Sequence, residues 1–70
     1  MADSIIEVAR RIVANHSAEE IDGLLLDAQT ANAIVQVHDA LNPTNQAKFA
    51  AMPLALMVDT AWKLIERSHG

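Results

Sequence analysis

The stretch SAEEIDGLLLDAQTANAIVQVHDALNP, residues 17–43, decides the fold that we predict. It opens on Ser17 with acidic residues shortly after it, a pattern that is typical of a helix N-cap and suits the positive end of the helix dipole. Apart from Gly23, no helix-breaking residue follows before Asn42-Pro43. We therefore expect one long helix over about residues 18–42.

This long helix would carry apolar side chains on two faces. One face holds Ile21, Leu24, Leu25, Ala28 and Val35, and the roughly opposite face holds Leu26, Ile34, Val37 and Leu41. A helix that rests on a single core needs only one apolar stripe. The second face therefore predicts self-association, with a two-fold dimer as the favoured arrangement. The alternative is a monomer in which the segment 44–52 folds back over this face.

Three further helices are predicted from their end signals. Ser4 and Glu7 have the spacing of a capping box, although Asp3 is an alternative cap. Asn42-Pro43 combines a good N-cap with a proline at the first helical position. Pro53 then breaks the chain, because the residue before a proline is disfavoured in the α region. The four predicted helices cover about residues 4–16, 18–42, 44–52 and 53–68.

The composition indicates a single small helical domain. The chain has 70 residues, of which 51% are apolar, and Phe49 and Trp62 are its two aromatic residues. The absence of cysteine excludes a disulfide framework and a thiolate zinc site. We predict an all-α domain over residues 1–70, a small bundle of three main helices plus one short helix.

The charge distribution argues against nucleic-acid binding. The chain carries five basic and nine acidic residues, and no basic residue lies between Arg11 and Lys48. Binding to nucleic acid draws much of its affinity from clustered Lys and Arg. The uncharged run from Phe49 to Val58 is shorter than the roughly 20 residues of a membrane span and contains a proline. We expect a soluble, cytoplasmic protein with no membrane association.

No motif predicts catalysis, a cofactor or a metal. The chain has no Gly-rich phosphate loop, no nucleophile elbow and no H-E-x-x-H motif. His38 and Asp39 are neighbours on a predicted helix, so their side chains diverge by about 100° and do not together hold one metal. We expect His16 to cap the end of the first helix and His38 to be structural or solvent-facing. The protein is therefore predicted not to be an enzyme.

The C-terminal half holds most of the large side chains. They form either an adaptable partner groove or part of the core, and the scarcity of large residues favours the core. The residues concerned are Phe49, Met52, Leu56, Met57 and Trp62. We expect Trp62 to be largely buried. Leu56 falls on the helix side that carries Lys63 and Arg67, so it is either covered by the preceding segment or exposed at an interface.

The stretch ALNPTNQAKFAAMPLALMVDTAWKLIE, residues 40–66, resembles small uncharacterised helical proteins encoded by phages of actinobacteria. The resemblance rests on the N-P opening, the M-P break and the A-W-K-L ending, and it brings no functional motif. It implies a short accessory gene product that acts in the bacterial host cytoplasm by binding a host or phage protein.

Two functions follow from these observations. The first is a non-enzymatic interaction protein that self-associates and binds a protein partner. The alternative is a small regulator that acts on DNA or on the transcription machinery. Salt-dependent binding to duplex DNA would favour the alternative.

Overall fold

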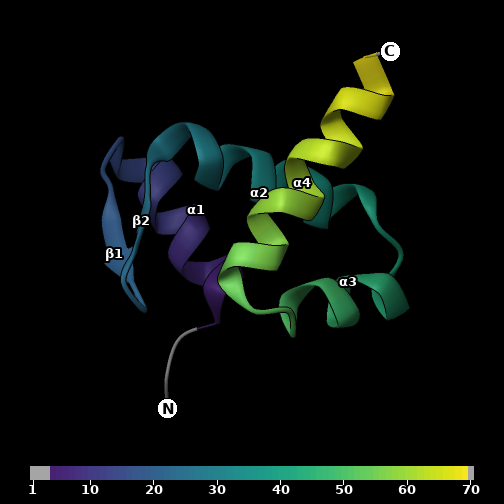
Figure 1. Cartoon of the computed structure of the whole chain (residues 1–70), viewed down its shortest axis with the longest axis horizontal. Coiled ribbons are helices and arrows are strands. Elements are labelled where there is room, and N and C mark those ends of the chain that lie inside the picture. Colours follow the sequence, from purple (N-terminus) through teal and green to yellow (C-terminus); the bar gives the residue numbers. More distant parts are fainter. Residues whose placement is uncertain (1–3, 70) are drawn as a thin grey trace.

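The computed structural model describes the backbone of residues 4–69 and the side chains of residues 4–67 (Figure 1). Its elements are α1 (Ile5–Asn15), β1 (Glu19–Ile21), β2 (Leu24–Leu26), α2 (Ala28–Ala40), α3 (Pro43–Ala50) and α4 (Leu54–His69). The fold is mostly helical, as predicted, but it also contains a small antiparallel sheet of β1 and β2, so the all-α prediction is only partly confirmed.

The predicted helix over 18–42 is wrong in its first third, where the chain forms a β-hairpin instead. Asp22 and Gly23 both have positive φ, at 51° and 82°. This is the backbone of a type I′ turn, whose twist matches that of the flanking strands and which favours Asp-Gly. The turn places Ile21 opposite Leu24 and starts the pairing of the two strands. The local preference for this turn therefore outweighs the capping pattern at Ser17.

Asp27, rather than Ser17, is the N-cap of the central helix. Its backbone is still extended (φ −89°, ψ 172°), and its side chain accepts a hydrogen bond of 2.8 Å from the backbone N–H of Thr30. Because the chain leaves β2 in an extended conformation, helical geometry begins only after this residue. The observed α2 is therefore 13 residues long.

The first helix begins where the sequence predicts. The Ser4 hydroxyl accepts a hydrogen bond of 3.2 Å from the backbone N–H of Glu7, whereas Asp3, the alternative cap, lies outside the described residues. At the other end, His16 adopts a left-handed conformation (φ 51°) and its backbone N–H bonds to carbonyls of the last turn. The exposed His16 thus ends the helix through its backbone, not through the imidazole that we expected.

The two prolines also act as predicted. Asn42 accepts a hydrogen bond of 2.9 Å from the Asn45 N–H, and Pro43 is the first residue of α3. A break of three residues follows α3, and the Pro53 carbonyl accepts the hydrogen bond of 2.9 Å from the Met57 N–H at the start of α4. The last two helices consequently run in different directions (Figure 1). Pro53 itself precedes the last helix, so α4 starts at Leu54, one residue later than predicted.

The core surrounds α2, which contacts α1, α3 and α4 and lies between α1 and α4 in Figure 1. Its buried residues come from all four helices and from β2: Ile6, Val8, Ala9, Ile12, Leu26, Ala31, Ala33, Ile34, Val37, Phe49, Leu54, Met57 and Ala61. Glycine and charged residues are absent from this set. The core is therefore built from apolar side chains of moderate size.

The face predicted for self-association lies inside this core. Leu26, Ile34 and Val37 are buried within a single chain, and Leu41 is partly buried. This face is consequently not available to a second copy, and its assignment as the contact surface is wrong. The reason is that α2 is short and lies between other helices of the same chain, which cover both of its apolar sides.

Candidate protein-interaction surface

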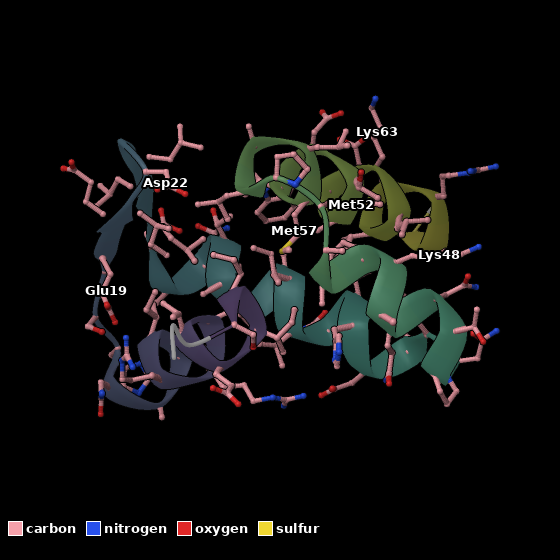
Figure 2. All side chains as sticks on the ribbon, turned by 90° about the horizontal axis from the view of Figure 1, so that it is seen from below. Glu19, Asp22, Lys48, Met52, Met57 and Lys63 are labelled. Atoms are coloured by element: carbon pink, nitrogen blue, oxygen red, sulfur yellow. The ribbon has the colours of Figure 1, made fainter. Side chains whose placement is uncertain are left out.

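The residues considered for a partner groove are divided between core and surface. Phe49 and Met57 are buried, Met52 and Trp62 are partly buried, and Leu56 is 50% exposed. Figure 2 shows Met57 directed between the helices. The five residues thus do not together line an exposed groove.

Trp62, which we expected to be largely buried, is partly buried and packs against the core. Met57 and Ala61, four residues apart on α4, are fully buried and mark the line along which this helix meets the core. The next residue on a helix points about 100° away, so Trp62 lies at the margin of that line.

Three large apolar side chains are exposed within the described part of the chain, and two of them are neighbours in β2. Leu25 is 72% exposed, Leu24 is 42% exposed, and Leu56 on α4 is the third. Leu26, the next residue of β2, is only 1% exposed. Strand β2 therefore exposes two leucines, whereas Leu56 is isolated on another element.

The register of the hairpin explains which leucine is outside. Side chains alternate between the two faces of a strand. Glu20 and Leu25 are directly opposite each other, so they share one face, and both are exposed. The other face carries the pairs Ile21–Leu24 and Glu19–Leu26, and on it Leu26 is buried in the core, whereas Leu24 lies at the exposed end next to the turn. A solvent-facing sheet surface is usually polar, and Leu25 departs from that rule.

The surroundings of these leucines are acidic. Residues 16–27 contain four acidic residues and no lysine or arginine. Within this stretch, Glu20 and Asp22 are exposed. Figure 2 shows Glu19 and Asp22 at one end of the molecule and Lys48 and Lys63 toward the other. We call Glu20, Asp22 and Leu25 together the hairpin surface.

An ion pair holds the hairpin against α1. Arg11 donates hydrogen bonds of 3.1 and 3.0 Å to the two carboxylate oxygens of Glu19. Both side chains remain accessible, so this contact contributes to orientation more than to stability. It leaves the outer face of the hairpin unobstructed.

A second polar cluster joins α1 to the last turn of α2. Arg10 donates hydrogen bonds of 2.5 and 3.3 Å to Asp39, and Nδ1 of His38 lies 3.3 Å from Oδ1 of the same carboxylate. The hydrogen bonds from Arg10, followed by that with His38, lower the pKa of Asp39, and the contact raises the pKa of Arg10. Because the Arg10 and Asp39 side chains are about half exposed, the cluster orients the helices without forming an enclosed site.

Lys63 and Asp59 form the ion pair that their spacing on α4 predicts. The two groups are 2.9 Å apart, and the hydrogen bond to Asp59 raises the pKa of Lys63. Lys63, one of the two basic residues on the helix side of the exposed Leu56, is thus paired within its own helix.

The described residues assemble no group of metal ligands. Among residues 4–69, no group of three or more His, Asp or Glu is placed to hold a metal ion, and no buried polar side-chain atom lacks a hydrogen-bond partner in the part of the chain that is described. The hairpin surface is therefore the candidate functional site.

The hairpin surface could have been found from the sequence. An Asp-Gly pair between apolar runs is a strong hairpin signal, and it is present at Asp22-Gly23. Read as a hairpin, the sequence would have placed Leu25 and Glu20 on one face. The capping pattern at Ser17 led to the helical interpretation instead.

Comparison of the chain with protein-family models, with curated proteins and with solved structures found no match in any of the three. None of the described helices combines the length and the hydrophobicity needed to cross a membrane. Any statement about function therefore depends on the surface that the fold itself exposes.

Proposed function

We propose that the protein is a small, non-enzymatic interaction protein that binds a protein partner through the hairpin surface. The observation that carries the proposal is the exposure of Leu25, at 72%, on the outer face of the hairpin. Burying a leucine side chain contributes about 1.5–3 kcal/mol, a contribution that this chain does not obtain by itself. A partner that covers Leu25 would supply it.

The position of Leu25 distinguishes it from a leucine that is exposed by chance. Single exposed apolar residues are common on protein surfaces. Leu25 lies on the outer face of the hairpin, with the acidic Glu20 directly opposite and Asp22 in the adjoining turn. An apolar centre with a charged margin is the usual anatomy of a binding surface.

The resemblance of residues 40–66 to actinobacteriophage proteins supplies the context of this proposal. It implies an accessory protein in the cytoplasm of a bacterial host, with a host or phage protein as the partner. The homodimer that the sequence suggested stays a prediction, but it needs a face other than the buried one. Pairing two hairpin surfaces would bring the Glu20 and Asp22 carboxylates of both copies together, which like-charge repulsion opposes.

The charges do not favour the alternative, a regulator that binds DNA. Arg10, Arg11 and Lys63 each engage a carboxylate, and Leu25 lies in an acidic region. Phosphates would be repelled from that region and would find no cluster of cations elsewhere.

Capture from an actinobacterial lysate with tagged Leu25→Ser tests the proposal. The matched control is Leu56→Ser, because it removes the exposed leucine of α4. We expect the wild type and the control to retain the same partner and Leu25→Ser to lose it, with equal melting temperatures for all three. Equal capture by Leu25→Ser and the wild type would overturn the proposal, as would the absence of any specific partner.

A further inference from the structure

The geometry of the hairpin points to the class of partner: we propose that the hairpin surface binds a basic segment of another protein. A lysine or arginine of that segment would lie with its methylene stem on Leu25 and its cationic head at Glu20. This inference rests on the proposed function and specifies what the interaction surface recognises.

The first argument is the juxtaposition of an apolar and an acidic side chain on one face. Glu20 and Leu25 are direct cross-strand partners, and such pairs have Cβ atoms about 4.5–5.5 Å apart. Both side chains are exposed on the outer face. Long basic side chains combine an apolar stem with a charged end, so one of them contacts both groups at once.

The second argument is the charge of the surroundings. Asp22 lies in the turn beside this pair, and residues 16–27 contain no lysine or arginine that would compete for the two carboxylates. The nearest ion pair that holds the hairpin, Arg11 with Glu19, uses a different carboxylate. Glu20 and Asp22 therefore present negative charge to an approaching cation, and electrostatic complementarity gives both specificity and fast association.

The third argument concerns the alternative occupant, a second copy of this chain. Three of its five basic groups, Arg10, Arg11 and Lys63, are already engaged with carboxylates of their own chain. A second copy would thus bring few available cations and a net charge of −4. A basic segment of a different protein fits the surface better.

The test is a fluorescence-anisotropy titration with a labelled peptide of four Arg-Gly repeats at low salt. The comparison peptides have citrulline, which is uncharged, or glutamate in place of arginine. We expect the arginine peptide to bind the wild type and the two comparison peptides not to bind. Binding of the citrulline peptide with equal affinity would overturn the role of charge.

Two pairs of variants separate this site from general attraction between opposite charges. Glu20→Gln removes a charge at the site, and Glu66→Gln removes one from α4. Leu25→Ser and Leu56→Ser form the corresponding apolar pair, both without change in charge. We expect Glu20→Gln and Leu25→Ser each to weaken binding about fivefold and the two α4 variants to leave it unchanged.

Equal effects of Glu20→Gln and Glu66→Gln would overturn the inference, because they would mean non-specific attraction. If no peptide binds while the wild type self-associates and Leu25→Ser does not, the occupant is a second copy, and the inference is wrong. If Leu25→Ser loses the lysate partner but the peptide does not bind, the interaction function stands and the partner is not basic. The failure of the inference is thus distinguishable from that of the proposed function.

Discussion

The side chain of Asp27 separates the hairpin from the central helix. It follows the buried Leu26 directly and accepts the hydrogen bond from the Thr30 N–H that begins α2. That backbone hydrogen bond is the main reason why the pKa of Asp27 lies below its usual value. One carboxylate therefore ends one element and begins another, and its charge and its capping function can be tested separately.

Replacing Asp27 with alanine should lower the free energy of unfolding by about 1 kcal/mol, the typical effect of losing an N-cap side chain. Asn is as good an N-cap as Asp, so Asp27→Asn should retain most of the stability at neutral pH. Chemical denaturation of both variants at pH 7 measures the difference. Equal stability of the alanine variant and the wild type would contradict the assigned start of α2.

Acid should destabilise the protein. Asp27 and Asp39 both have a lowered pKa in the folded state, by the hydrogen bonds from Thr30 and Arg10 respectively. Their contribution is present above the pKa of the unfolded chain, about 3.9, and is lost as the pH falls through the folded-state pKa. Melting temperatures measured from pH 6 to pH 2 should fall at the acid end, and less steeply in a double variant with Asn at both positions. An unchanged slope in that variant would show that other carboxylates dominate.

At the scale of elements, the hairpin depends on the helices that support it. A two-stranded sheet is marginal by itself in water, and the strands here have three residues each. Leu26 anchors β2 in the core, and Arg11 of α1 holds Glu19 of β1. The turn between the strands supplies the remaining constraint, because both of its residues have positive φ.

Gly23→Ala should therefore weaken the hairpin through backbone strain alone. A Cβ atom at this position would meet no other atom within 4 Å, but φ is +82°, which disfavours residues with a side chain by about 1–2 kcal/mol. Asparagine tolerates positive φ better, so Gly23→Asn is the matched control and should be milder. Amide hydrogen exchange of residues 19–26 should accelerate most in the alanine variant. Equal exchange in the two variants would argue against the strained turn.

For the whole molecule, the decisive feature is the position of α2 among α1, α3 and α4. It places Ile34 and Val37 in the interior and leaves the exposed leucines to β2 and α4. A domain of this size gains only about 3–5 kcal/mol of net stability from its core. A buried defect should thus affect folding as a whole, whereas a change on the hairpin surface should not.

Val37→Glu should unfold the chain, since Val37 is buried and the described core contains no charged side chain to pair with a new carboxylate. Leu25→Glu should remain folded, because this residue faces solvent. Circular dichroism and light scattering distinguish the outcomes. A folded Val37→Glu monomer formed from a wild-type dimer would instead support the original dimer face and contradict the packing of α2.

The sequence by itself determined the helical class and the ends of most helices. Capping at Ser4 and Asn42 and the break at Pro53 depend on backbone groups within a few residues, so local chemistry predicts them. The hairpin was also encoded locally, in Asp22-Gly23, but it competed with the helix-cap pattern of Ser17. Because the hairpin signal and the helix-cap signal are of similar strength, the sequence alone does not show which of the two structures forms.

Only the tertiary structure decided which apolar residues meet solvent. Leu24, Leu25 and Leu26 are chemically identical and adjacent, yet they range from 72% to 1% exposed. Their exposure depends on the alternation of the strand and on where the hairpin rests against the helices. The same packing buried the face that the sequence offered for self-association. Burial is a property of contacts between distant segments, so the candidate interaction surface emerged only when those segments were placed together.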